Sequence, residues 1–113
     1  MERHPLSPRL DHCPEGLPRA AYLDESWFTQ EMATVFSRGW VMAGRLADFA
    51  PGTMRRVTVG PAQVVVCRMA DGAVSAFHNT CRHRGSELCR AEVEPLGKLV
   101  TCPYHAWAYA AKD

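Results

Sequence analysis

The sequence predicts a mainly β fold, a small antiparallel β-sandwich preceded by an extended arm and one packed helix. Three observations indicate this class. Residues 1–20 contain four prolines and little periodicity, and residues 21–39 carry one apolar stripe at helical spacing. Residues 40–113 divide into short β-prone runs separated by turn residues. The 113 residues suit one domain with a modest core.

The helix is predicted between two capping signals. Asp24 is a suitable N-cap, and Gly39 can close the C-terminus after Arg38 in the last turn. Trp27 and Trp40 are expected to pack at its two ends. The apolar stripe recurs at positions i, i+4, i+7 and i+8, so we expect it to be buried. Its members are Phe28, Met32, Val35 and Phe36.

Turn dipeptides divide the remainder of the chain into strands. Gly60-Pro61 and Ala70-Asp71-Gly72 separate Val-rich runs and therefore predict hairpins. The expected strands are 40–43, 54–59, 63–69, 73–77, 98–101 and a last run through Tyr109.

Charge and hydropathy exclude several classes of partner. The formal net charge is +1 and the 13 basic residues are scattered, so nothing supports nucleic-acid binding. The longest apolar stretch is far too short for a membrane span, and the N-terminus lacks the apolar core of a signal peptide. We therefore expect no membrane association and a cytoplasmic protein.

The cysteine content favours metal binding. An odd number and uneven spacing argue against a disulfide framework, which the cytoplasm would also keep reduced. Cys67, within a Val-rich run, is expected to be a buried small hydrophobe, and Cys89 a partly exposed free thiol. The five cysteines are Cys13, Cys67, Cys81, Cys89 and Cys102.

Two short motifs carry the chemistry. Cys81-Arg82-His83 is a C-x-H pair, and Cys102-Pro103-Tyr104-His105 is a C-x-x-H pair. Each offers one thiolate and one imidazole on a single loop, as a Rieske centre requires when two cysteines hold one iron and two histidines the other. A zinc finger would favour C-x₂₋₄-C with H-x₃₋₅-H instead.

The motifs CRHRG and CPYHAWAY resemble the cluster-binding pair in the large (α) subunits of Rieske non-haem iron oxygenases. The upstream runs YLDESWFTQEMATVFSRGW and VVVCRMADGAVSAFHNTCRHRG are also similar to these subunits. The resemblance implies a Rieske (ISP-like) β-sandwich over 40–113 with one [2Fe–2S] cluster per chain. It also implies that Cys81 and Cys102 ligate the inner iron, and His83 and His105 the outer one.

The resemblance further implies electron transfer. In the family, electrons come from a reductase or ferredoxin and pass to a mononuclear Fe(II) that activates O₂. That iron lies in a catalytic domain of the same or a neighbouring subunit, usually in a homotrimer, and needs a 2-His-1-carboxylate triad. None of His4, His12 and His78 has the required spacing. We therefore expect the N-terminal part of an aromatic-ring-hydroxylating-type oxygenase, C-terminally incomplete and without catalytic residues of its own.

Two alternatives remain open. The length fits a stand-alone Rieske ferredoxin, an electron carrier, whereas the helix before residue 40 favours the oxygenase. A zinc-stabilised structural module is a third possibility. The N-terminal half is also similar to subunits acting on quaternary ammonium compounds such as betaines.

Overall fold

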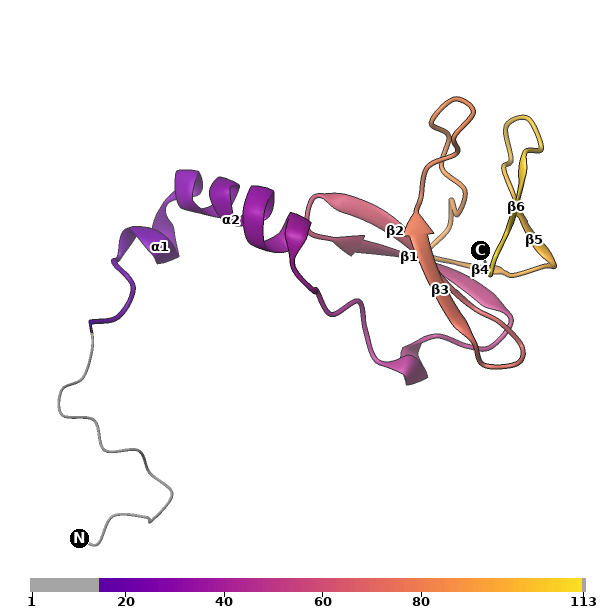
Figure 1. Cartoon of the computed structure of the whole chain (residues 1–113), viewed down its shortest axis with the longest axis horizontal. Coiled ribbons are helices and arrows are strands. Elements are labelled where there is room, and N and C mark those ends of the chain that lie inside the picture. The colour runs from indigo at the N-terminus through magenta and orange to yellow at the C-terminus, as the bar shows by residue number, and fades with distance from the viewer. Residues whose placement is uncertain (1–14, 113) are drawn as a thin grey trace, which may run out of the picture.

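The computed structural model describes residues 15–112, so the arm residues His4, His12 and Cys13 lie outside the described part. Helices precede strands along the chain, as Figure 1 shows. The elements are α1 (Ala20–Leu23), α2 (Glu25–Arg38), the 3₁₀ turn η1 (Leu46–Asp48), β1 (Thr53–Val59), β2 (Ala62–Arg68), β3 (Val74–His78), β4 (Val93–Pro95), β5 (Leu99–Thr101) and β6 (Ala108–Ala110).

The strands form two antiparallel sheets, which confirms the mainly β prediction. One sheet has four strands in the order β3-β2-β1-β4, and the other pairs β5 with β6. The predicted hairpin at Gly60-Pro61 is present, with Val59 opposite Ala62. The Ser75 hydroxyl donates a hydrogen bond to the Ala111 carbonyl, which ties the end of the small sheet to β3.

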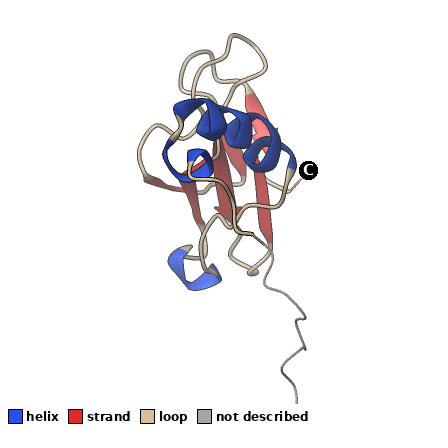
Figure 2. Cartoon of the chain, turned by 90° about the vertical axis from the view of Figure 1, so that its left-hand side faces the viewer, coloured by secondary structure: helices blue, strands red, loops and turns tan. Residues whose placement is uncertain are grey.

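Helix α2 begins and ends where the capping signals predict. The Asp24 carboxylate accepts the Ser26 N–H at 3.0 Å, and Gly39 follows the last helical residue. Seen from its own end of the molecule, the helix lies in front of the strands (Figure 2). Its C-terminal end meets the β1–β2 turn, where a Cβ on Gly60 would lie 2.9 Å from the Phe36 Cβ and carbonyl oxygen. Glycine is thus required at this close approach.

The expected burial of the helix stripe is wrong in this chain. Phe28 is 57% exposed and Phe36 38% exposed, because the described contact is with a turn at the end of the sheet rather than with a sheet face. The expected strand 40–43 is also absent, and the expected packing of Trp40 at the end of the helix is wrong, because Trp40 is fully exposed. This segment has no neighbouring strand with which to pair.

The core lies between the two sheets and includes four cysteines. Cys67 is buried as predicted, whereas Cys89 is fully buried against the expectation of a partly exposed thiol. The Asn79 side chain explains this difference, since it bonds the Cys89 backbone and holds the residue inside. The core residues are Met54, Val65, Cys67, Cys81, Leu88, Cys89, Val100, Cys102 and Ala111. No helix among residues 15–112 has the length and apolar character to cross a membrane.

Candidate metal centre

Two loops with the same backbone pattern carry the Cys–His motifs. We call residues 81–86 the first loop and residues 102–107 the second loop. The Cys81 N–H donates to the Ser86 carbonyl at 2.8 Å, and the Cys81 carbonyl accepts the Gly85 N–H at 2.9 Å. The second loop has the same two bonds. The Cys102 N–H donates to the Trp107 carbonyl at 2.7 Å, and the Ala106 N–H donates to the Cys102 carbonyl at 3.0 Å.

The fifth residue of each loop adopts a left-handed backbone conformation. Gly85 has φ 75° and Ala106 has φ 59°, the one positive φ at a non-glycine residue in the described chain. Only glycine reaches this region without a steric cost from its Cβ. The second loop therefore carries backbone strain that the first loop avoids.

Exchanging these two residue types should change stability in opposite directions. We expect Ala106→Gly to raise the free energy of unfolding by about 1 kcal/mol, because relief of the left-handed cost exceeds the added chain entropy. Gly85→Ala should lower it by about the same amount, although open space surrounds its missing Cβ. Urea unfolding of both variants, at equal metal content, measures this. A shift of both variants in the same direction would contradict the assignment of strain to the backbone.

The two motif thiols face inward. Cys81 is 2% and Cys102 3% exposed. The Tyr109 hydroxyl lies 3.0 Å from the Cys81 sulfur, and its oxygen also accepts the Arg82 N–H at 3.1 Å. Because that oxygen already accepts a hydrogen bond, its single proton is available to the sulfur.

Hydrogen bonding makes the Cys81 thiol more acidic than an ordinary cysteine. The Tyr109 hydroxyl is the main cause of its lowered pKa, with smaller contributions from the His83 backbone N–H and the Cys102 thiol. The same bond raises the pKa of Tyr109, so both shifts describe a phenol donating to a thiolate. In contrast, burial raises the pKa of Cys67 to about 11. A metal requires the thiolate form, which this site favours at Cys81 and not at Cys67.

The two motif imidazoles lie on the exposed side of the loops. The rings of His83 and His105 meet edge to face, with centroids 4.9 Å apart. Trp107 stacks on His83 at 4.8 Å with an interplanar angle of 5°, and Tyr104 lies against His105 at 3.8 Å. Both aromatic partners remain substantially exposed. The four motif side chains thus form a buried pair of thiols and an exposed pair of imidazoles.

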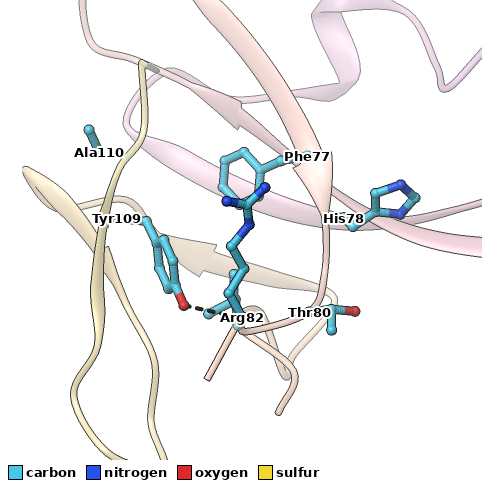
Figure 3. Close-up of a pocket in the computed structure, with 7 residues that line it drawn as sticks. Phe77, His78, Thr80, Arg82, Tyr109 and Ala110 are labelled. Atoms are coloured by element: carbon cyan, nitrogen blue, oxygen red, sulfur yellow. Dashed lines mark hydrogen bonds between the residues drawn. The ribbon is translucent and has the colours of Figure 1, made fainter. Parts of the chain in front are cut away.

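A cavity of about 440 Å³ is lined by Tyr109 and Arg82, among others, and by neither motif cysteine. In Figure 3, the Arg82 side chain extends past Tyr109 towards the Phe77 ring, and His78, at the end of β3, also lines the cavity. His78 is exposed and lies outside both loops. The motifs alone predict no role for Tyr109, although its position four residues after the second motif histidine could have indicated one.

Two loops that each offer one thiol and one imidazole supply the donor set of a Rieske-type iron–sulfur domain. Among residues 15–112, no three histidine, cysteine or acidic side chains converge as a site for one metal ion. A Rieske centre takes two protein ligands on each of two irons. Residues 39–113 match the family model of the Rieske [2Fe–2S] domain, and the chain belongs to this family.

Curated relatives are subunits of oxygenases. The glycine betaine monooxygenase oxygenase subunit of Pseudomonas aeruginosa is 44% identical over 95 residues, covering 83% of this chain and 22% of the relative. The benzene 1,2-dioxygenase subunit alpha of Pseudomonas putida is 39% identical over 89 residues, covering 78% and 20%. These names favour an oxygenase over a stand-alone ferredoxin. The chain spans about a fifth of the length of these relatives.

Solved structures give the same family. The quaternary ammonium Rieske monooxygenase CntA superposes with a TM-score of 0.71 at 28% identity, covering 84% of this chain and 26% of that one. Naphthalene 1,2-dioxygenase gives a TM-score of 0.65 at 36% identity, covering 78% and 20%. The matching family model describes a Rieske [2Fe–2S] domain, so the cofactor of this domain is a [2Fe–2S] cluster.

Proposed function

We propose that this chain is the electron-transfer part of a Rieske oxygenase and that Cys81, His83, Cys102 and His105 hold its cluster. The proposal rests on the burial of the four side chains: the thiols of Cys81 and Cys102 are buried, and the imidazoles of His83 and His105 are exposed. When bound, the [2Fe–2S] group accepts and releases one electron.

The donor set fits this group chemically. Soft thiolates suit iron–sulfur centres, and the Tyr109 hydroxyl stabilises the deprotonated form of Cys81. Cys81 and Cys102 share the inner side of the loops and take one iron. His83 and His105 share the outer side and take the other iron.

The exposed side of the site suits exchange with a partner protein. Both imidazoles reach the surface, and each contacts an exposed aromatic ring, Trp107 or Tyr104. An electron carrier needs one edge of its centre close to the surface, while the thiol side stays shielded from water. The histidine side is therefore the face at which the chain exchanges electrons.

The proposed partners are an electron donor and an electron acceptor. The chain accepts electrons from a reductase or ferredoxin and gives them to a mononuclear iron in a catalytic domain, of its own or a neighbouring subunit in a homotrimer. Support comes from a solved quaternary ammonium Rieske monooxygenase, similar to this chain, that is described with inter-subunit electron transfer. We place the protein in the cytoplasm, where its described thiols, free in the structure, would stay reduced.

The substrate class we propose is a quaternary ammonium compound. It is supported by the glycine betaine monooxygenase subunits among the relatives and by CntA among the structures. Oxygen uptake by the full-length subunit and its reductase, with glycine betaine compared with benzene, tests the class. Faster uptake with benzene would overturn it.

Reconstitution of the chain tests the central proposal. With iron and sulfide supplied anaerobically, we expect two irons and two sulfides per chain, visible absorption, and an EPR signal after chemical reduction. A colourless, EPR-silent protein that holds one zinc ion would overturn the proposal in favour of a structural module.

Removing the Tyr109 hydroxyl should lower the reduction potential. Hydrogen bonds to cluster sulfurs stabilise the reduced, more negative state, so Tyr109→Phe loses that stabilisation. Redox titration followed by visible absorption measures the shift. Tyr104→Phe is the matched control, because the structure gives the Tyr104 hydroxyl no hydrogen bond to either thiol. Equal potentials for Tyr109→Phe and the parent chain would contradict the role of this hydrogen bond.

A further inference from the structure

We propose that Asn79 is a positioning residue that fixes the first loop and thereby the geometry of Cys81 and His83. The inference rests on the proposed function, in which these two residues hold the cluster. It adds a residue that touches no ligand atom and acts through the backbone.

Asn79 directly follows β3 and is 3% exposed, the one buried polar residue in the described chain. Its Oδ1 accepts the N–H groups of Leu88 at 2.9 Å and of Cys89 at 2.8 Å. Its Nδ2 donates to the Cys89 carbonyl at 2.9 Å. One amide therefore binds three backbone groups that lie on the far side of the first loop.

Those backbone groups depend on the amide because water cannot replace it. Leu88 is 4% exposed and Cys89 is fully buried, so their polar backbone atoms lie in the core. A buried N–H or carbonyl without a partner is unfavourable. Loss of the amide would therefore pull residues 88–89 towards solvent and open the end of the first loop.

The two loops are closed by different means. β5 and β6 flank the second loop directly, with Thr101 paired to Ala108, so a strand ladder holds both of its ends. After the first loop, residues 88–89 lie in no strand. Asn79 anchors one side through its backbone N–H to the Gln63 carbonyl at 3.0 Å and the other side through its side chain. The Asn79 amide therefore holds the two ends of the first loop together, as the β5–β6 strand pair holds the two ends of the second loop.

The experiment compares Asn79→Ala and Asn79→Asp with the parent chain, each reconstituted as full-length protein. Asn79→Ala removes all three bonds, and Asn79→Asp keeps an acceptor but loses the donor to Cys89. We expect cluster loss to a chelator to be about ten- to a hundredfold faster in Asn79→Ala, with an intermediate rate in Asn79→Asp. Both variants should also show a shifted reduction potential and an altered EPR signal, because the loop that carries Cys81 and His83 has moved.

Val66→Ala is the control for a merely structural effect. Val66 is buried on β2 but lies outside the core cluster that contains both motif cysteines. This variant should melt at a lower temperature and keep the parent's potential and EPR signal.

Three outcomes would overturn the inference. Asn79→Asp with the parent's rate, potential and EPR signal would overturn it, even if Asn79→Ala failed to fold. If Val66→Ala showed the same spectral changes as the Asn79 variants, the effect of Asn79 would be a general loss of stability rather than positioning of the first loop. A parent chain that binds no [2Fe–2S] cluster would instead overturn the proposed function, and this inference with it.

Discussion

Replacing Cys81 or Cys102 by alanine is expected to abolish binding of the [2Fe–2S] cluster. Each substitution removes one of the two thiolates proposed for the same iron, and no other described thiol lies in the two loops. A Rieske cluster needs two protein ligands on each iron, and either substitution leaves one iron with a single protein ligand. Iron and sulfide content per chain, with visible absorption after reconstitution, measures the loss.

Cys67→Ala is the matched control for this loss. Cys67 is also buried, but burial raises the pKa of its thiol to about 11, so it stays protonated at neutral pH. This variant should retain two irons and two sulfides per chain, at some cost in stability from the cavity. Full cluster content in Cys81→Ala, or complete loss in Cys67→Ala, would show that the wrong thiols have been assigned.

Changing His83 or His105 to cysteine should keep a cluster and lower its reduction potential strongly. A thiolate in place of a neutral imidazole adds negative charge, which disfavours uptake of an electron. The potential should move from the Rieske range of roughly −150 to +300 mV towards the value of about −400 mV for plant-type ferredoxins. Redox titration and the EPR signal of the reduced chain measure the change.

Two further variants test the same assignment. His78→Cys places a thiol at an exposed position on β3, outside both loops, and should leave the potential unchanged. His83→Ala removes a proposed ligand without a replacement and should alter the EPR signal. An unchanged signal in His83→Ala would exclude His83 as a ligand.

Local signals in the sequence predicted most of the fold. The caps of α2 and the strands β1, β2 and β3 lie within about one residue of their expected bounds, because turn dipeptides and Val-rich runs act locally. The short strand β4 was missed, since its three residues form no pattern and pair only with the start of β1. The exposed helix stripe could not be foreseen, because periodicity indicates an apolar face without saying what covers it.

The residues of the two motifs were the part of the candidate site that the sequence predicted. C-x-H and C-x-x-H identify the residues by spacing, and both loops are present with their thiols and imidazoles sorted. Tyr109 and Asn79 were not predicted, because Tyr109 bonds a sulfur 28 residues away and Asn79 bonds backbone groups nine and ten residues away, and no local pattern in the sequence marks either contact. The ligand roles themselves, and the division of the chain into arm, helix and cluster domain, remain predictions.

The small size of the sheet formed by β5 and β6 has a thermodynamic consequence. A ribbon of two three-residue strands is marginal by itself, and here Val100 is its one buried residue, with Ala111 buried directly after β6. A cluster held by both loops joins the β5–β6 ribbon to the rest of the domain. Part of the free energy of cluster binding therefore stabilises the folded ribbon. Amide hydrogen exchange in the ribbon should slow on loading, while the long β1–β2 ladder, with its seven-residue strands, stays protected throughout.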